Sequence, residues 1–250
     1  MRLGAIQFDV AWHDPTANLG HLRSLLAGAA AEGVELAVLP EMFATGFSMD
    51  AERVARHGPS IVERLVEQAA RHEMWIAGSV AMPGAAGRPP VNEFVAIAPD
   101  GETHRYVKRH PFSLSGEDRH YASGDELVTF GVGGVRVSPF ICYDLRFGPD
   151  FWNRAVGTDL FLVVANWPTR RIEHWTTLLR ARAIENQAYV AGVNRIGEGG
   201  GVEHGGSSMI IDPMGVVIRE ATDGEAILIA DIEPSMVADA RGALPFLGDR

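Results

Sequence analysis

The 250-residue sequence predicts an α/β fold built from layers of strands and helices. Short apolar runs typical of buried strands alternate with segments that have the spacing of amphipathic helices. Apolar residues make up 46% of the chain, which is enough for a large core. No linker-like or charged block interrupts this pattern, so we expect a single domain over residues 1–250.

The N-terminal elements follow the order strand, helix, strand. The apolar run Leu3–Phe8 predicts the first strand, and Asn18–Ala31 has its apolar residues at helical spacing. Gly33 follows this helix at a position where glycine commonly ends one. The run Val34–Leu39 then predicts the second strand.

The middle of the chain is predicted to be mainly strands. Ser60 and Glu63 form a capping-box pattern that opens a helix reaching about His72. After it, alternating and apolar runs predict a series of strands separated by glycine-containing turns. These strands are Trp75–Val80, Glu93–Ala98, Glu102–Val107, Val128–Phe130 and Val135–Ile141.

The last third predicts a strand, a helix and then only strands. Leu160–Ala165 has the continuous apolar character of a buried strand, and Glu173–Gln187 has helical spacing. The glycine-rich stretch Gly197–Gly206 lacks the lysine of a phosphate-binding loop and predicts a mobile loop near a pocket. The remaining strands are Tyr189–Val193, Ser208–Ile211, Val216–Arg219 and Ala226–Ile232.

Composition excludes several classes of function. The formal charge is −10 with acidic and basic residues interspersed, which disfavours a nucleic-acid partner. No apolar run approaches the roughly 20 residues of a membrane span, and the N-terminus meets polar residues too early for a signal peptide, so we expect a cytoplasmic protein. The single cysteine, Cys142, rules out an intramolecular disulfide and a cysteine-based zinc cluster.

Four polar residues stand directly after predicted strands, where α/β enzymes place their sites. They are Glu41, Lys108, Cys142 and Asn166. Each also has a purely structural interpretation. Cys142 would serve as a small buried apolar residue, Glu41 and Lys108 as a surface ion pair, and Asn166 as the cap of a turn.

Taken together, three of these residues supply what amide hydrolysis by a thiol requires. Cys142 is the nucleophile, and Glu41 is a base able to take the thiol proton and return it to the departing amine. Lys108 adds a positive charge that favours the thiolate and opposes the charge developing on the carbonyl oxygen. The backbone N–H of Tyr143, directly after the nucleophile, is a candidate second donor to that oxyanion.

Motifs along nearly the whole chain make the sequence resemble the nitrilase-like carbon–nitrogen hydrolases, whose catalytic residues are glutamate, lysine and cysteine in that order. Any one motif is weak, but their number and order make a chance resemblance implausible. The motifs are Gly4–Gln7, Leu39–Phe43, Gly46–Ser48, Tyr106–His110, Ile141–Phe147, Ala165–Pro168, Arg182–Gln187, Gly206–Ser208 and Ile211–Pro213. Two residues depart from the motifs of this family, namely Pro111 after Lys108–His110 and Gly148 after Arg146–Phe147. Neither is at a catalytic position.

The resemblance implies a four-layer αββα sandwich that assembles as a homodimer or higher homo-oligomer and needs no cofactor. It assigns Glu41 as general base, Lys108 as oxyanion stabiliser and Cys142 as nucleophile. Many members use a second glutamate beside the lysine. Glu117 is the candidate for it here, with Asp118 or Glu126 as the alternative.

Within that family the motifs look most like the ω-amidase branch, which hydrolyses the terminal amide of 2-oxo dicarboxylic acid monoamides such as 2-oxoglutaramate or 2-oxosuccinamate. A substrate carboxylate needs a local cation on an acidic protein, and Arg146 is a candidate for that contact. A salt bridge with Asp144 or Asp150 is its structural alternative. The other candidate pocket residues are Trp167, Phe43 and His174.

Competing interpretations stay open from the sequence. An N-carbamoyl amino acid or a nitrile are alternative substrates for the same triad, and a catalytically idle binding protein is the alternative from another class. A Cys–His pair has no supporting local motif, and His104, His110 and His120 lack the spacing of metal ligands, so we expect no metal site. The apolar segment Ala243–Leu247 is expected to dock against some surface.

Overall fold

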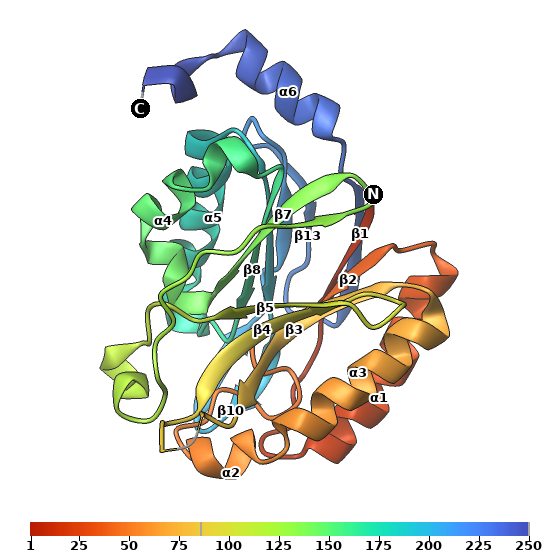
Figure 1. The fold of residues 1–250 in the computed structure, drawn as a ribbon, viewed down its shortest axis with the longest axis vertical. Coiled ribbons are helices and arrows are strands. Elements are labelled where there is room, and N and C mark those ends of the chain that lie inside the picture. Colours follow the sequence, from red (N-terminus) through yellow and green to blue (C-terminus); the bar gives the residue numbers. More distant parts are fainter. Residues whose placement is uncertain (86, 250) are drawn as a thin grey trace.

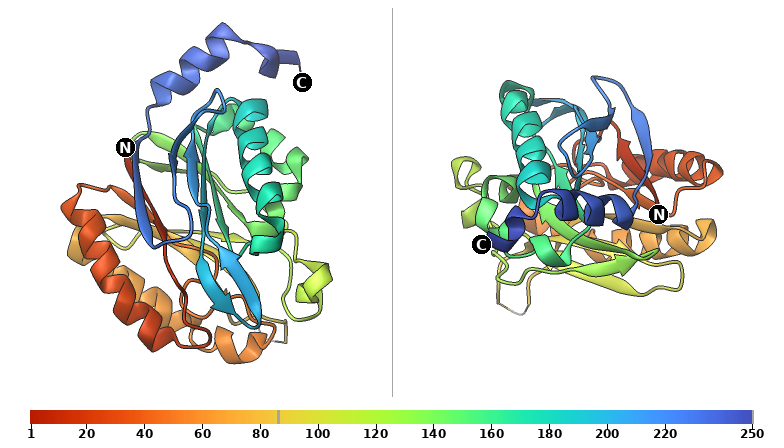
Figure 2. Two further views of the ribbon diagram at one scale, coloured as in Figure 1. Left: turned by 180° about the vertical axis from the view of Figure 1, so that it is seen from behind. Right: turned by 90° about the horizontal axis from the view of Figure 1, so that it is seen from above.

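The computed structural model describes residues 1–85 and 87–249, and it has the predicted αββα layers (Figure 1). Two six-stranded sheets face each other, and helices cover their outer faces, as the rotated views also show (Figure 2). The first sheet has the strand order β14 (Ala226–Asp231), β1 (Arg2–Gln7), β2 (Leu36–Val38), β3 (Trp75–Met82), β4 (Val91–Ile97), β5 (Thr103–Val107). The second has the order β13 (Val217–Glu220), β12 (Met209–Ile211), β9 (Tyr189–Asn194), β8 (Leu160–Ala165), β7 (Val135–Ile141), β6 (Phe130–Val132).

Helices form the two outer layers. Helices α1 (Pro15–Ala31) and α3 (Gly58–His72) pack on the first sheet, and α4 (Gly148–Trp152) and α5 (Ile172–Asn186) pack on the second (Figure 1). Helix α2 (Ala51–Ala55) and helix α6 (Pro234–Ala243) complete the set of α-helices in the described chain. The 3₁₀ turns are η1 (Ser113–Ser115), η2 (Glu117–Arg119), η3 (Cys142–Arg146), η4 (Ala155–Gly157), η5 (Thr169–Arg171) and η6 (Phe246–Asp249).

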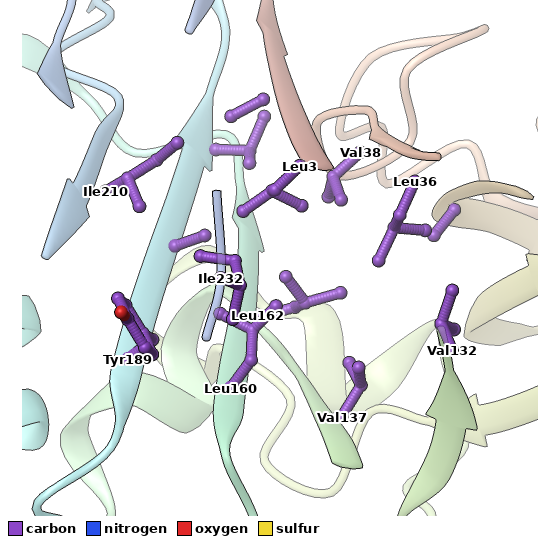
Figure 3. Close-up of a cluster of buried hydrophobic side chains, with 14 of the residues drawn as sticks. Leu3, Leu36, Val38, Val132, Val137, Leu160, Leu162, Tyr189, Ile210 and Ile232 are labelled. Carbon is purple, nitrogen blue, oxygen red and sulfur yellow. The ribbon is translucent and has the colours of Figure 1, made fainter. Parts of the chain in front are cut away.

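The main core lies between the two sheets. Figure 3 shows side chains from both sheets meeting there, including Leu3 and Leu36 from the first and Leu160 and Leu162 from the second. Strand β8 explains why this region folds as it does. Its alternate residues Leu160, Leu162 and Val164 face the other sheet, while Phe161, Val163 and Ala165 face the helices. A strand buried on both faces requires the continuous apolar sequence observed.

Strand direction brings the candidate residues to one edge. Strands β1, β2 and β3 are parallel, and so are β7, β8 and β9. Strand β5 reverses twice relative to β3, through antiparallel β4, and so runs in the same direction as β3. The carboxyl ends of β2, β5, β7 and β8 therefore deliver Glu41, Lys108, Cys142 and Asn166.

Two local predictions were wrong, and a helix forms in one segment for which no element was predicted. Helix α3 begins at Gly58, and Ser60 Oγ donates to His57 O (2.9 Å), so Ser60 is not the cap of a capping box. The C-terminal tail from Pro234 forms helix α6, because a proline fits the first turn of a helix. The glycine-rich stretch is a β-hairpin, β10 (Ile196–Gly199) paired with β11 (Val202–Gly205).

The hairpin owes its form to two glycines at its turn. Gly200 and Gly201 have φ values of +59° and +77°, and a two-residue hairpin turn of this kind needs positive φ at both positions. The glycines that suggested a mobile loop thus make a tight turn. No helix within residues 1–85 or 87–249 is long and apolar enough to cross a membrane.

Candidate active site

The strand ends assemble a buried cluster of two carboxylates around one ammonium. Lys108 Nζ lies 2.9 Å from Glu41 Oε1, and 3.0 and 2.9 Å from the two carboxylate oxygens of Glu117. The side chains of all three residues are at most 1% exposed. Three buried charges in mutual contact form one electrostatic unit in which each group affects the ionisation of the others.

Two asparagines fix the carboxylate of Glu41. Asn166 donates its backbone N–H to Glu41 Oε2 (2.8 Å), and its side-chain amide donates to the Glu41 carbonyl oxygen. Asn92 Nδ2 donates to Glu41 Oε1 (2.8 Å). Asn166 thus holds Glu41 in place instead of only capping a turn. Sequence reasoning missed Asn92, whose only signal is an asparagine inside a strand, where this residue type is uncommon.

Of the three acids considered beside the lysine, Glu117 is the one that contacts it. Its Oε2 also accepts the Phe112 N–H (2.5 Å), and its side chain is fully buried. Asp118 and Glu126 are exposed. Burial, with the nearby Glu41 charge adding to it and Lys108 opposing it, raises the pKa of Glu117 above its ordinary value.

Cys142 lies at a strained turn directly after β7. Its φ is +47°, a left-handed conformation that side chains other than glycine rarely adopt. The carboxylate of Asp144 fixes this turn, because its Oδ2 accepts the Ile141 N–H (3.0 Å) and the Tyr106 hydroxyl (2.7 Å). The turn lets the thiol reach a cavity while the strand before it stays buried.

The cluster keeps the thiol protonated at rest. Burial, together with the charge of Glu41, raises the pKa of Cys142 well above its usual range, and Lys108 opposes this only in part. Burial alone would lower the pKa of Lys108, but Glu117 and Glu41 outweigh it and hold that pKa well above the usual value. Lys108 is therefore a permanent cation, and the thiol is hydrogen-bonded to the Glu41 carboxylate.

Tyr143 N–H is the second donor expected at the oxyanion. Tyr143 is the second residue of η3, and the first N–H groups of a helix have no acceptor within it. The Tyr143 side chain lines the same cavity as the thiol.

The cavity above Cys142 has a volume of about 360 Å³, and its wall includes the aromatic side chains of Trp12, Phe47, Phe112, Tyr143 and Trp167. Trp167 and Arg146 line it, and the Arg146 guanidinium lies over the Trp167 ring, 5.1 Å from the centroid. Phe43, expected in the pocket, is instead fully buried in the core between the first sheet and its helices. His174 is exposed on α5, where its Nδ1 contacts Arg146 Nη2 (2.9 Å).

Arg146 does not form the salt bridges considered as its structural alternative. Asp144 is occupied by Tyr106, Ile141 and the His110 N–H. Asp150 pairs with Arg109 and His110. Within the described residues, no three histidine, cysteine, aspartate or glutamate side chains gather in a way that would hold a metal ion.

Known proteins match this chain over nearly its whole length. The Carbon-nitrogen hydrolase family matches residues 2–242. The chain is 42% identical to the omega-amidase YafV of Escherichia coli (strain K12), over 95% of this chain and 91% of that protein. It is 32% identical to the 2-oxoglutaramate amidase of Bacillus subtilis (strain 168), over 99% and 96% of the two chains.

Solved structures agree with these sequence matches. XC1258 from Xanthomonas campestris, described as a CN-hydrolase superfamily protein, superposes with a TM-score of 0.94 at 36% identity, covering 100% of this chain and 97% of that one. Its likeness extends over both sheets and the outer helices, since the whole chain is covered. This chain therefore belongs to the carbon–nitrogen hydrolase family.

Proposed function

We propose that this protein hydrolyses the ω-amide of a short 2-oxo dicarboxylic acid monoamide, such as 2-oxoglutaramate or 2-oxosuccinamate, and releases ammonia through a thioester at Cys142. The observation that carries the proposal is the buried Glu41–Lys108–Glu117 cluster beside the single cysteine, at the floor of a cavity that also holds arginine side chains. The names of the E. coli and B. subtilis relatives support this choice of substrate.

The first half of the reaction forms the thioester. Cys142 Sγ attacks the amide carbon as Glu41 takes the thiol proton, which suits a resting thiol whose pKa is raised. Lys108 Nζ and the Tyr143 N–H stabilise the negative charge on the carbonyl oxygen. The C–N bond then breaks, and Glu41 returns its proton to the nitrogen, which leaves as ammonia.

The second half restores the enzyme. Glu41 takes a proton from a water molecule, whose oxygen attacks the thioester carbon through the same stabilised oxyanion. The C–S bond breaks, and the proton on Glu41 returns to the sulfur as the carboxylic acid forms. Glu117 acts by holding Lys108 in position and balancing its charge, since it accepts two hydrogen bonds from Nζ.

The charge of the cavity supports an anionic substrate. The chain carries a formal charge of −10, yet no aspartate or glutamate is among the residues lining the cavity, whereas arginines are. A carboxylate remote from the scissile amide would find its counter-charge there. An N-carbamoyl amino acid also carries a carboxylate and stays the nearest alternative. A simple nitrile carries no carboxylate that the arginines could bind.

Substrate profiling tests the proposal. Ammonia release is measured from 2-oxoglutaramate, glutamine, an aliphatic nitrile and an N-carbamoyl amino acid, with Cys142→Ala as the control. We expect the highest kcat/KM for 2-oxoglutaramate and none in the variant. A higher kcat/KM for the carbamoyl compound would move the function to that class, and no turnover of any of the four would favour an idle binding protein.

Assembly and location are further parts of the proposal. Apolar residues beside and within the turn that follows β12 are exposed, namely Ile184 (51%), Met214 (53%) and Val216 (56%). A second copy of the chain would cover them, and we propose a homodimer or higher homo-oligomer in the cytoplasm. Light scattering on the purified protein decides the oligomeric state.

A further inference from the structure

Arg171 is a cavity residue for which the reaction scheme has no role. It ends the 3₁₀ turn η5 at the start of α5, and its side chain lines the same cavity as Cys142. Its guanidinium lies over the Phe112 ring, 5.2 Å from the centroid. Over the described parts of the chain, its side chain forms neither an ion pair nor a hydrogen bond, although it is half-buried.

Arg171 belongs to a group of cavity arginines that form no ion pair with any of residues 1–85 and 87–249. Arg146 and Arg170 line the same cavity, and no acidic residue lines it. Burial lowers the pKa of Arg171, and the charges of Arg170 and Arg146 lower it further. Several uncompensated cations at one partly apolar wall are unfavourable in the empty protein, and an anionic ligand relieves their repulsion.

The indole of Trp167 contacts the backbone of Arg171 and the guanidinium of Arg146. Trp167 Nε1 donates to the Arg171 carbonyl oxygen (2.8 Å), and the Arg171 N–H donates to the Pro168 carbonyl oxygen (3.0 Å). The ring of Trp167 also supports the Arg146 guanidinium. Each guanidinium also lies over an aromatic ring, that of Arg171 over Phe112 and that of Arg146 over Trp167, and groups positioned in advance lose little conformational entropy when a ligand binds.

We infer that Arg171, with Arg146, forms the subsite for the substrate carboxylate remote from the scissile amide, and that Arg171 determines the preference for anionic over neutral amides. This inference rests on the proposed function, because it names the group that selects its substrate class. The competing role is that Arg171 acts on the sulfur, since the Cys142 charge and Arg171 influence each other.

The test separates carboxylate binding from an effect on the thiol. We compare wild type, Arg171→Gln and Arg171→Lys, with Arg180→Gln, an exposed arginine of α5, as matched control. One readout is kcat and KM for 2-oxoglutaramate. The other is the rate at which neutral iodoacetamide alkylates Cys142, the only cysteine, with and without 2-oxoglutarate as a protecting dicarboxylate.

We expect Arg171→Gln to raise KM about 10- to 100-fold, as loss of a charge-assisted contact does, with kcat within about threefold. The rate of iodoacetamide alkylation should stay within about twofold, and protection by 2-oxoglutarate should weaken in parallel with KM. Arg171→Lys should recover part of the loss, because it keeps the charge but not the planar fork. Arg180→Gln should match wild type.

A KM in Arg171→Gln equal to that of Arg180→Gln would overturn the inference. So would a slower alkylation rate together with a lower kcat, which would place Arg171 at the sulfur. If wild type does not hydrolyse 2-oxoglutaramate, the proposed function fails by itself. The subsite then stands only if 2-oxoglutarate protects Cys142 in wild type and protects it less in Arg171→Gln.

Discussion

At the scale of single residues, the reactive cluster has two carboxylates and one ammonium, and this balance decides how the thiol reacts. The charge of Lys108 favours the thiolate, as the sequence predicts, but burial and the charge of Glu41 outweigh it. In the structure both Glu41 and Glu117 contact Lys108, and the pKa of Cys142 is raised. In the reaction that we propose, deprotonation of the thiol and attack on the substrate therefore belong to one step, and Lys108 acts mainly on the oxyanion.

Glu41→Gln should leave a folded protein without measurable turnover, because glutamine keeps the shape of the side chain but cannot accept the thiol proton. Loss of a general base typically costs about 10²- to 10⁴-fold, and here the same group serves both halves of the reaction. The measurement is kcat together with the circular dichroism spectrum, and Glu173→Gln, an exposed glutamate of α5, is the control. A variant keeping most of its activity would remove Glu41 from the role of base.

Lys108→Gln should be inactive and also less stable by about 3–5 kcal/mol, since it leaves two buried carboxylates without their cation. Adding Glu117→Gln to Lys108→Gln removes one of these charges and should recover part of the stability but none of the activity. Urea unfolding of the single and double variants measures the loss of stability and its partial recovery. Equal stability of wild type and Lys108→Gln would mean that the three groups are not charged as described.

At the scale of elements, Asp144 joins the ends of the two strands that are followed by Lys108 and Cys142. Its Oδ1 accepts the His110 N–H (2.9 Å) just beyond β5, and its Oδ2 accepts the Ile141 N–H at the end of β7. Burial raises its pKa to about 6, although these hydrogen bonds favour the ionised form. The relative position of Lys108 and Cys142 thus depends on one ionised carboxylate.

Activity should fall as the pH drops through about 6, because a proton on Asp144 faces groups that all donate to it. Tyr106→Phe removes a hydrogen bond that lowers this pKa, so the acid limb of the pH–kcat profile should move to higher pH by about one unit or less. An unmoved limb in Tyr106→Phe would assign the limb to another group.

Folding stability should change with pH in the opposite direction through this same group. The folded-state pKa of about 6 lies above the ordinary value of 3.8, so folding takes up a proton between these values. The contribution, on the order of 3 kcal/mol, is fully present below the ordinary value and is lost as the pH rises through 6. Through this group the protein should be more stable at pH 5 than at pH 7, and thermal unfolding at the two pH values measures the difference. A loss of activity at pH 5 without a loss of stability would then come from protonation of Asp144 and not from unfolding.

Strand ends were the part of the site that the sequence predicted best. Glu41, Lys108 and Cys142 follow apolar runs, so their position at one edge of the sheets could be expected before the structure. Asn92 and Arg171 could not, because their roles depend on contacts between segments far apart in sequence. The hairpin at Gly200 was missed because glycine suits both a mobile loop and a tight turn.

At the scale of the whole molecule, the two sheets act as one unit through the core between them. Strands predicted from apolar runs all occur, with ends that differ by a few residues. Central strands such as β8 and β9 are buried on both faces, and such burial demands apolar residues at nearly every position. Short helices such as α2 and α4 escaped prediction because five residues carry too little periodicity. The family resemblance, and not the pattern, supplied the pairing of the sheets.

Leu162→Ala should destabilise the protein by about 2–5 kcal/mol, since it opens a cavity in the fully buried layer between the sheets. Leu114→Ala, the same change at a side chain that is 78% exposed, should stay within about 0.5 kcal/mol of wild type. Urea unfolding with a constant m-value measures both. Equal effects of the two substitutions would contradict the described core.

A rapid-quench experiment detects the proposed thioester on Cys142. Wild type and Cys142→Ala are mixed with 2-oxoglutaramate, and ammonia release and intact-protein mass are followed together. We expect wild type to release ammonia and to gain a mass equal to the substrate less ammonia on Cys142, while Cys142→Ala, with an unchanged circular dichroism spectrum, does neither. Ammonia release by Cys142→Ala at a rate close to that of wild type would contradict the proposed thioester.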